Sequence, residues 1–241
     1  ISKVSPKWFT LNISVFGKNN DGSITEAKQV IQNYGNANGP NKKQVPHAHQ
    51  VSFSPDKKYV LGNDLGIDKV FTYAYNPNSP DEILKKKDSI SVKPGSGPRH
   101  LTFSKNGKFV YLLQENDGTV TAFNYSNGTL KKIQETSVVS KDFTGTIGAA
   151  DIHISPDGKF LYATNRGTAN DISIFKILKN GKLESKGKIS TKGNGPRSFA
   201  IDPSGNFLLV AHQYTNDVVI FKRNKKTGSI KDTGKIFTLC S

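Results

Sequence analysis

Hydrophobic and polar positions alternate along most of the chain, in short runs separated by turns rich in Gly, Asn, Asp and Pro. One pattern, a polar turn followed by a β-rich apolar run, aligns without gaps at 54–64 (SPDKKYVLGND), 104–114 (SKNGKFVYLLQ), 155–165 (SPDGKFLYATN) and 202–212 (DPSGNFLLVAH). The copies start 50, 51 and 47 residues apart, and each follows a short apolar strand, at 51–53, 101–103, 152–154 and 199–201. Each copy therefore predicts a β-hairpin.

A second alternating run follows each hairpin, with an aromatic residue at an equivalent position. These runs cover 69–75, 119–125, 171–177 and 217–223, and a fifth copy at 12–16 has no hairpin before it. A turn and then a run containing Lys and Glu come next, as expected for an exposed edge strand. Four strands in each unit of roughly 50 residues are typical of a β-propeller blade.

The fold class that follows is all-β, a β-propeller of four-stranded blades. Five copies of the outer half and four of the inner half indicate that about 4.5–5 blades are present. A two-sheet sandwich would leave the repeat period unexplained, and no window shows the sustained 3.6-residue period of a helix. We expect one incomplete propeller domain over 1–241, with 1–11 and 236–241 outside the repeat.

Composition limits the environment of the protein. No apolar run reaches the ~18 residues of a membrane span, so we expect no membrane partner. Cys240 is the only cysteine, which excludes a disulfide scaffold and a Cys-based zinc site and fits a reducing compartment, so we expect a cytoplasmic protein. The sequence begins at Ile1 and contains no Met, from which we expect an incomplete reading frame.

The net charge of +15, from 34 Lys+Arg against 19 Asp+Glu, at first suggests a nucleic-acid partner. Most Lys residues stand beside turn residues, as in Lys57-Lys58 and Lys131-Lys132, which is typical of a solvated surface. No aromatic platform for stacking bases interleaves with the Lys clusters. We therefore predict no nucleic-acid partner.

Function is expected at two columns of the repeat, just before the first inner strand and just after the second, because these positions form the mouth of a propeller channel. All five His and three of the four Arg lie in these columns. Before the hairpins stand 46–50 (PHAHQ), 97–100 (GPRH), 149–153 (AADIH) and 195–198 (GPRS); after them stand 64–66 (DLG), 114–116 (QEN), 165–167 (NRG) and 212–213 (HQ). Since Arg binds phosphate and carboxylate bidentately, the columns predict a cationic funnel for a small anionic ligand.

Three carboxylates also lie in the funnel columns: Asp64, Glu115 and Asp151. Glu115 shares a column with Arg166 and Gln213, and a carboxylate among His and Arg is a candidate general base. No Ser-centred nucleophile elbow, P-loop or dinucleotide fingerprint is present. We predict no metal site, because His47-Ala48-His49 has no Cys or carboxylate at ligand spacing.

Six motifs carry a family resemblance: PHAHQVSFSPD, DLGIDKV, GPRHLTF, ADIHISPDGKFLYATNRG, GPRSFAIDPSGNFLLVAHQ and KKTGSI. From about Asn12 to Lys235 the chain resembles the seven-bladed β-propeller lactonases of the bacterial 6-phosphogluconolactonase type, whose fold the fungal carboxy-muconate cyclases share. The resemblance implies hydrolysis of 6-phospho-D-glucono-1,5-lactone to 6-phosphogluconate in the pentose phosphate pathway, without an organic cofactor. It also implies that about two blades are missing, and we expect the open propeller edges to allow an oligomer.

The resemblance places the channel cluster of the family on His47, His49, Arg99, Glu115, His153 and Arg166, and Arg197 of the second Pro-Arg motif joins them. As catalytic residues we expect Glu115, His49, His153 and Arg99. As substrate-binding residues we expect His47, His100, Asn165, Arg166, Arg197 and Gln213. In this hypothesis an Arg holds the phosphate and stabilises the oxyanion, Glu115 or a His activates water, and another His protonates the leaving ring oxygen.

Two alternatives stay open. One is a non-catalytic propeller that binds anionic ligands or protein partners, favoured by the missing blades and the basic surface. The other is a lactonase or cyclase for another sugar acid or muconate, which needs the same chemistry of an anion beside a lactone. Lactone hydrolysis supports an enzyme, and binding of a phosphate ligand without turnover supports a binding module.

Overall fold

The structure, a computed structural model, describes residues 12–33 and 45–238. All regular elements of this part are antiparallel β-strands. Several hairpin turns need positive φ and have glycine there, as at Gly107 (φ 69°) and Gly158 (φ 73°). The chain divides into two compact units, Ile1–Pro98 and Arg99–Ser241. Segment 1–11, which we expected outside the repeat, is not among the described residues.

The first unit contains a two-stranded and a four-stranded sheet. The smaller sheet pairs β1 (Asn12–Lys18) with β2 (Ile24–Gln32). The larger sheet has the order β3 (Ala48–Phe53), β4 (Tyr59–Asp64), β5 (Lys69–Tyr75) and β6 (Leu84–Ser91). Apolar side chains from both sheets form one core: Ile13, Val60, Ile67, Phe71, Tyr73 and Leu84.

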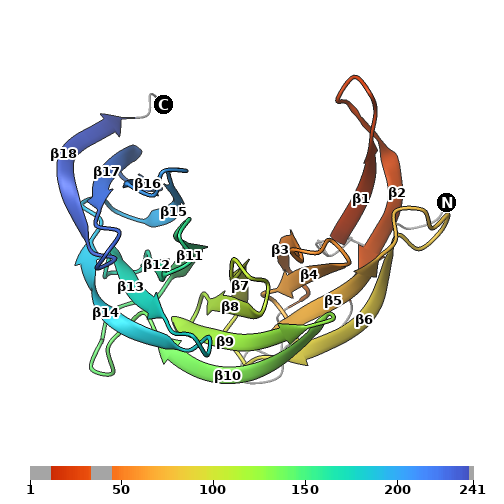
Figure 1. The fold of residues 1–241 in the computed structure, drawn as a ribbon, viewed down its shortest axis with the longest axis horizontal. Helices are drawn as coiled ribbons and strands as arrows, with labels where there is room; N and C mark the ends of the chain where they lie inside the picture. Colours follow the sequence, from red (N-terminus) through yellow and green to blue (C-terminus); the bar gives the residue numbers. More distant parts are fainter. Residues whose placement is uncertain (1–11, 34–44, 239–241) are drawn as a thin grey trace, which may run out of the picture. The chain divides into compact units, whose positions relative to one another are not determined.

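The second unit consists of three four-stranded sheets, each with its strands in chain order. The first has β7 (Pro98–Phe103), β8 (Phe109–Gln114), β9 (Thr119–Ser126) and β10 (Thr129–Ser137). The second has β11 (Ala149–Ile154), β12 (Phe160–Asn165), β13 (Asp171–Ile177) and β14 (Leu183–Ser190). The third has β15 (Pro196–Ile201), β16 (Phe207–His212), β17 (Asp217–Arg223) and β18 (Ile230–Thr238). Figure 1 shows β7, β11 and β15 together at one side of this unit, with β10, β14 and β18 at the other.

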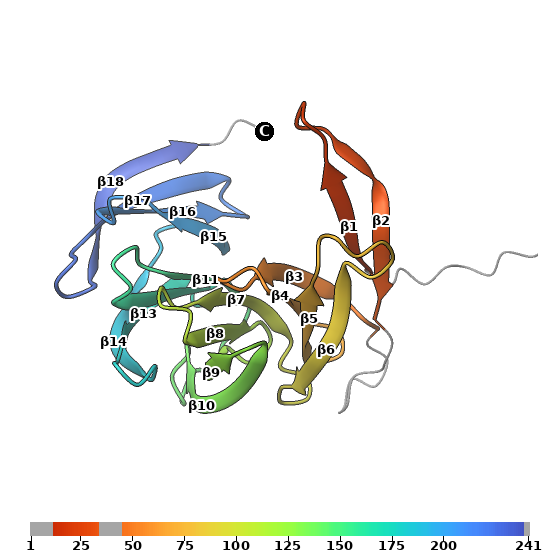
Figure 2. The ribbon, with the colours of Figure 1, turned by 45° about the vertical axis from the view of Figure 1, so that its right-hand side comes forward.

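One glutamine contact repeats between the outermost strands of neighbouring blades. In the second unit the Gln134 side chain of β10 accepts from Leu183 N (2.6 Å) and donates to Leu183 O (2.9 Å) of β14. In the first unit Gln29 of β2 makes the same two bonds to Leu84 N (2.8 Å) and O (3.0 Å) of β6, and Figure 2 shows β2 beside β6. Strands β1 and β2 are therefore the outer half of a blade. Within the described residues this confirms a β-propeller of four complete four-stranded blades and one outer pair.

The third strand of each complete blade lies where the sequence predicts it. The aromatic residue at its equivalent position is buried in every blade: Tyr73, Phe123, Phe175 and Phe221 are 0–4% exposed. Tyr73, Phe175 and Phe221 pack into cores between neighbouring sheets. The core between the last two sheets also contains Phe160, Tyr162 and Leu208. Alternation along these strands is thus a consequence of burial between neighbouring blades.

The innermost strand of every complete blade begins three residues earlier than predicted. The starts are at Ala48, Pro98, Ala149 and Pro196. In β3, β11 and β15 the pairing continues across a β-bulge that interrupts the apolar alternation. Residues 236–238, expected outside the repeat, continue β18, where Ile236 pairs with Val219 and Thr238 with Asp217.

Candidate active site

A bulge near the start of the innermost strands brings polar side chains to one end of the second unit. The pairing of β11 with β12 shifts register between Ala149 and Ile152, and that of β15 with β16 shifts between Pro196 and Ser198. Asp151 and Arg197 lie within these shifts. Because a bulged residue leaves the regular ladder and its side chain is re-aimed, the bulges place polar groups where simple alternation would not.

Glu115, which follows β8, is held between two guanidinium groups. Its Oε2 lies 2.8 Å from Arg99 Nε, and its Oε1 lies 2.9 Å from Arg166 Nη2. Arg99 also donates to the backbone oxygen of Ala150, and Arg166 Nε donates to Gly148 O at 3.1 Å. Burial lowers the pKa of Arg99, and the negative charge of Glu115 opposes that effect. Three predicted site residues therefore form one ion-pair cluster.

Asp151 of β11 is the centre of a second cluster that joins three innermost strands. Its Oδ1 lies 2.8 Å from His100 Nδ1 of β7, and its Oδ2 lies 3.1 Å from His153 Nε2. Oδ2 also accepts from Ser198 Oγ (2.8 Å) and from Phe199 N (3.1 Å) of β15. Burial by itself raises the pKa of Asp151, but the hydrogen bonds from His100, His153 and Ser198 outweigh burial and hold that pKa well below its usual range. Asp151 is therefore a carboxylate at neutral pH.

The partners of His100 assign its tautomer. Arg99 Nη1 lies 3.3 Å from His100 Nε2, and a guanidinium can only donate. His100 therefore carries its proton on Nδ1, toward Asp151, and accepts at Nε2. This contact also links the Glu115 cluster to the Asp151 cluster.

A cavity of about 330 Å³ lies beside the two clusters. It is lined by Arg99, His100, Arg197, Ser198, Ala211, His212 and Gln213. Arg197 is exposed and donates to Gln213 Oε1 at 3.1 Å, whereas the side chains of Arg99 and Arg166 are only 3% and 13% exposed. Of the three predicted arginines, Arg197 is therefore the most accessible to an anionic ligand.

Asn165, the last residue of β12, is fully buried. Its Oδ1 accepts a hydrogen bond from Gly148 N at 2.9 Å. Asp64, the equivalent residue of β4, is also fully buried and accepts from His47 N (2.7 Å) and Gly66 N (3.2 Å). In both blades this position ties the loop before the first strand to the end of the second. Asn165 thus holds the backbone next to Arg166.

His47 and His49 belong to the first unit. Their rings lie nearly parallel, with centroids 6.1 Å apart and an angle of 20° between the planes. Asn33 supports the same region, since its Nδ2 donates to Asp64 Oδ2 at 2.9 Å and its Oδ1 accepts from the Tyr73 hydroxyl at 3.2 Å. The catalytic role of His49 and the binding role of His47 stay predictions.

The sequence-based set of site residues omits Ser198 and His212, which line the cavity. Ser198 stands in β15 where His100 stands in β7, after the shared Pro-Arg pair, so alignment of the two motifs is the signal that finds it. His212 is buried, and its Nδ1 lies 2.6 Å from Asp217 Oδ1. The sequence signal for His212 is its position in the column after the second inner strand.

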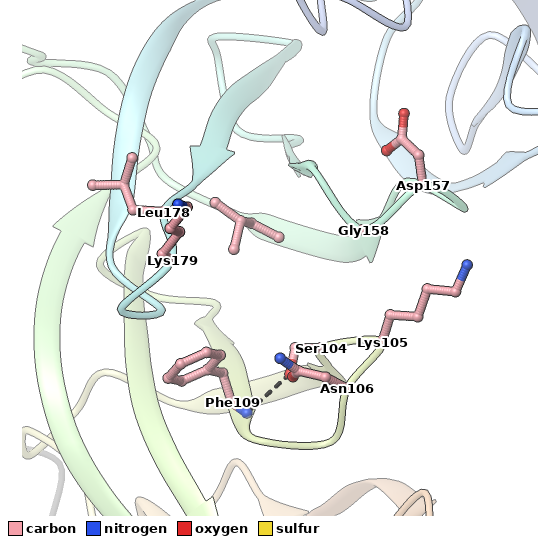
Figure 3. A pocket seen from close by; sticks show the side chains of 9 residues that line it. Ser104, Lys105, Asn106, Phe109, Asp157, Gly158, Leu178 and Lys179 are labelled. Atoms are coloured by element: carbon pink, nitrogen blue, oxygen red, sulfur yellow. Dashed lines mark hydrogen bonds between the residues drawn. The ribbon is translucent and has the colours of Figure 1, made fainter.

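Three further features concern metal sites, membrane-spanning helices and a second cavity. Within residues 12–33 and 45–238, no group of three or more His, Cys, Asp or Glu side chains is arranged to hold a metal ion. The same residues include no helix with the length and apolar character needed to cross a membrane. A larger cavity, about 430 Å³, lies at the opposite ends of the strands and is lined by turn residues including Lys105, Asp157 and Lys179 (Figure 3). It contains no predicted site residue, so we place the candidate site at the Glu115 end.

Comparison with known proteins places these features in a family. A family model described as a seven-bladed β-propeller lactonase matches residues 7–239. A 6-phosphogluconolactonase from Formosa agariphila is 42% identical over 194 residues, which cover 79% of this chain and 55% of the relative. The 6-phosphogluconolactonase of Bacillus subtilis is 36% identical over 194 residues, covering 79% of this chain and 54% of the relative.

Solved structures agree with the sequence comparisons. The periplasmic gluconolactonase of Pseudomonas aeruginosa superposes with a TM-score of 0.88 at 36% identity, covering 93% of this chain and 63% of that chain. The chain spans about half the length of the curated relatives it matches. The family match nevertheless extends over nearly all of this chain, and it includes every blade described above. The chain belongs to the family of seven-bladed β-propeller lactonases.

Proposed function

We propose that this chain hydrolyses a phosphorylated sugar lactone, 6-phospho-D-glucono-1,5-lactone, to 6-phosphogluconate. One observation carries the proposal. At one end of the second unit, the contact between Arg99 and His100 joins an Arg–Glu–Arg cluster to a His–Asp–His cluster. The relatives named 6-phosphogluconolactonase support this substrate. Hydrolysis of a lactone needs a base, an acid and stabilisation of an oxyanion, and these side chains supply all three without an organic cofactor.

Cationic side chains bind the anionic parts of the reaction in this proposal. Arg197 is exposed beside the cavity and binds the phosphate, for which the planar guanidinium offers paired donors. Arg99 and Arg166 share the single charge of Glu115, so their cluster keeps a net positive charge. That charge stabilises the oxyanion that forms when water adds to the lactone carbonyl.

Glu115 orients the two arginines in this proposal. Both of its carboxylate oxygens are already ion-paired with guanidinium groups, at 2.8 Å and 2.9 Å. A histidine is then the better base, because a neutral imidazole has one nitrogen that accepts a proton near neutral pH. The same histidine, once protonated, supplies the proton that the ring oxygen needs as it leaves.

An unphosphorylated sugar lactone is the second candidate substrate. The observation that favours it is the likeness to the Pseudomonas aeruginosa protein, which is named a periplasmic gluconolactonase. That name also offers an alternative to the cytoplasmic location that we propose from the pentose phosphate pathway. The phosphate group of the substrate distinguishes the two candidates.

Lactone hydrolysis by the purified chain, measured against spontaneous ring opening, tests the proposal. The phosphorylated lactone is generated with glucose-6-phosphate dehydrogenase, and its hydrolysis is followed by the reduction of NADP⁺ by 6-phosphogluconate dehydrogenase. Release of protons reports hydrolysis of D-glucono-1,5-lactone. Faster turnover of the phosphorylated lactone supports the proposal, and faster turnover of the neutral lactone supports the second candidate. Binding of 6-phosphogluconate in a calorimeter with no turnover of either lactone identifies a binding module.

A further inference from the structure

The proposed function needs a histidine as the base but does not say which one. The contact between His153 and Asp151 identifies it. We propose that His153 is the base that activates water, and that Asp151 is the positioning residue that fixes the tautomer and orientation of His153. This inference rests on the proposed lactone hydrolysis. It selects one histidine from several that the sequence offers.

The His153 ring is fixed on two sides. Its Nε2 lies 3.1 Å from Asp151 Oδ2, and a carboxylate can only accept, so the proton of the neutral ring is on Nε2. The ring packs edge-to-face against Phe199, with centroids 4.8 Å apart and an interplanar angle of 84°. The lone pair is therefore on Nδ1, which has no hydrogen-bond partner in the part of the chain that the structure describes. With its side chain 45% exposed, His153 is open to solvent.

His100, the other histidine on the same carboxylate, is occupied at both nitrogens. Its Nδ1 donates to Asp151 Oδ1 at 2.8 Å, and its Nε2 faces Arg99 Nη1 at 3.3 Å. A proton added at Nε2 would break the contact with Arg99 and place two positive charges side by side. The geometry therefore separates the two histidines, and His153 is the one with a nitrogen available to accept a proton.

Asp151 has the properties needed to support an imidazolium. It is 3% exposed and accepts from five donors: His100 Nδ1, His153 Nε2, Ser198 Oγ, Ile152 N and Phe199 N. These bonds outweigh the effect of burial and hold its pKa well below the usual range, so Asp151 stays negatively charged. A buried, oriented carboxylate that accepts from the far nitrogen of a histidine both fixes the ring and balances the charge that forms on it.

The proton follows a balanced path. The oxygen of water bonds to the lactone carbonyl carbon while one of its protons moves to His153 Nδ1, which gives a tetrahedral adduct and an imidazolium. The bond between that carbon and the ring oxygen then breaks, and the ring oxygen takes the proton from Nδ1. His153 is neutral again, and the new carboxylic acid releases its proton to solvent.

A pH–rate profile tests this assignment. Besides His153, the charged and titratable side chains of the two clusters and of the adjacent cavity are Asp151, Arg99, His100, Glu115, Arg166, Arg197 and His212. Histidine is the one residue type among them whose ordinary charge change falls between pH 5 and 8. An acidic limb of kcat in that range therefore reports a histidine, and its loss in His153→Gln assigns it to His153.

The experiment compares His153→Gln, Asp151→Asn and His100→Gln on the phosphorylated lactone, with Asp157→Asn as control. Asp157 lies in the turn at the opposite ends of the strands and pairs with Arg223, at 3.0 Å. We expect His153→Gln to lower kcat at least ~100-fold and to abolish the acidic limb. Asp151→Asn should lower kcat ~10²–10⁴-fold with little change in KM and move the limb to lower pH, because the imidazolium loses its counter-charge. His100→Gln should keep the limb, and Asp157→Asn should keep both kcat and the limb.

Nitrogen-15 NMR gives a readout that does not depend on turnover. The proton of neutral His153 should be on Nε2 in the unaltered chain and should lose that preference in Asp151→Asn. The inference is overturned if the unaltered chain is active and His153→Gln keeps kcat and its limb. It is also overturned if Asp151→Asn lowers activity only in proportion to its folded fraction. Absence of hydrolysis by the unaltered chain is a different result, since it overturns the proposed function itself and with it the catalytic role of His153.

Discussion

The Tyr162 hydroxyl of β12 donates a hydrogen bond of 2.6 Å to the backbone oxygen of Gly228, in the turn between β17 and β18. Tyr111 of β8 makes the equivalent bond, 3.0 Å long, to Gly181 O in the turn between β13 and β14. Both tyrosines are fully buried. This tyrosine–glycine contact therefore ties each of the first two blades of the second unit to the blade that follows it.

Replacement of Gly228 by alanine should destabilise the second unit strongly. Gly228 has φ +77°, and an added Cβ would clash with Cδ1 of the Phe160 ring. We expect the left-handed backbone to cost ~1–2 kcal/mol and overpacking ~1–3 kcal/mol of the free energy of unfolding. Urea denaturation measures the sum. Gly234→Ala is the matched control, because Gly234 has φ +72° with nothing within 4 Å. An equal loss in both variants would contradict the packing argument.

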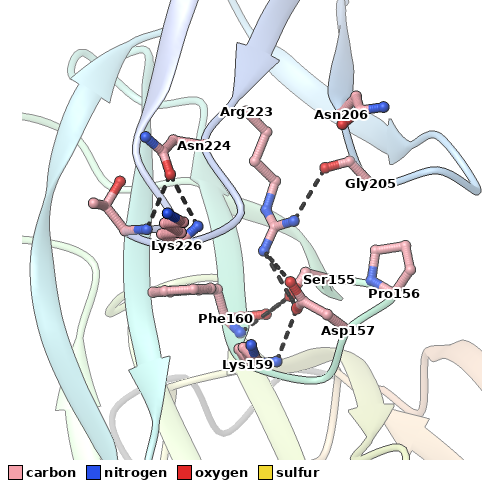
Figure 4. A network of polar contacts seen from close by, with 12 residues as sticks. Ser155, Pro156, Asp157, Lys159, Phe160, Gly205, Asn206, Arg223, Asn224 and Lys226 are labelled. Atoms are coloured by element: carbon pink, nitrogen blue, oxygen red, sulfur yellow. Dashed lines mark hydrogen bonds and ion pairs between the residues drawn. The ribbon is translucent and has the colours of Figure 1, made fainter.

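Arg223 is a structural arginine at the opposite ends of the strands from the candidate site (Figure 4). Its Nη2 lies 3.0 Å from Asp157 Oδ2, its Nη1 donates to Gly205 O at 3.0 Å, and its Nε donates to the Tyr162 hydroxyl at 2.8 Å. Arg223→Ala leaves these groups without their donor and should lower the free energy of unfolding by about 3 kcal/mol. Thermal unfolding followed by circular dichroism checks this. Below the unfolding transition kcat should be unchanged, and a selective loss of kcat would show that Arg223 acts on the site.

The blades could be predicted from the sequence because their signals are local. Alternation, turn glycines and the aromatic of each third strand depend on residues that are neighbours in the chain, and the structure places Phe175 and Phe221 as expected. The two funnel columns likewise predicted Arg99, Glu115 and Arg166, which lie together. Arg223, the one arginine outside the columns, lies away from the site.

The Asp151 cluster could not be predicted in full. Its donors His100 and Ser198 come from strands 51 and 47 residues away in the chain. Their meeting depends on the bulges in β11 and β15, which change which way a side chain points and leave no mark in an alternating pattern. Ser198 stands in a predicted funnel column, but its hydrogen bond to Asp151 depends on these bulges. Asn165 was expected to bind substrate, but it is fully buried because its side chain holds the loop at Gly148. Its position at the end of a strand did not reveal this burial.

Asp151 should also make folding stability depend on pH. Burial raises its pKa, but the hydrogen bonds from His100, His153 and Ser198 lower it further than burial raises it. An unfolded chain protonates an aspartate near pH ~3.9, while the folded chain resists this, so the stabilisation is fully present above that pH and is lost as pH falls below it. Asp151→Asn should be less stable at neutral pH and should lose less stability on acidification. Urea midpoints across this range measure the difference, and parallel pH dependences would contradict the assignment.

Glu115→Gln should reduce kcat/KM for the phosphorylated lactone at least ~100-fold. A neutral amide removes the charge that holds Arg99 and Arg166 at 2.8 Å and 2.9 Å and presents its NH₂ to one of the two guanidinium groups. The initial rate of the coupled assay measures the loss. Asp117→Asn, two residues further along, is the control and should change little, because Asp117 Oδ1 accepts from its own loop at Thr119 N (3.0 Å). Equal activity of Glu115→Gln and Asp117→Asn would remove Glu115 from the site.

Arg197 should determine the preference for a phosphorylated substrate. It is exposed beside the cavity, and its recorded side-chain bond is to Gln213 Oε1 at 3.1 Å, so its charge is not balanced by a carboxylate as those of Arg99 and Arg166 are. A hydrogen bond to a charged group contributes ~1.5–3 kcal/mol, which corresponds to ~10–150-fold in affinity. Arg197→Ala should therefore raise KM for the phosphorylated lactone by at least ~10-fold with kcat nearly unchanged, and should leave hydrolysis of D-glucono-1,5-lactone unaffected. Arg197→Lys keeps the charge without the paired donors and should recover part of the loss.

Steady-state kinetics on both lactones check the prediction. A parallel loss on the neutral lactone would show that Arg197 acts on the lactone ring, and unchanged KM in Arg197→Ala would place the phosphate elsewhere.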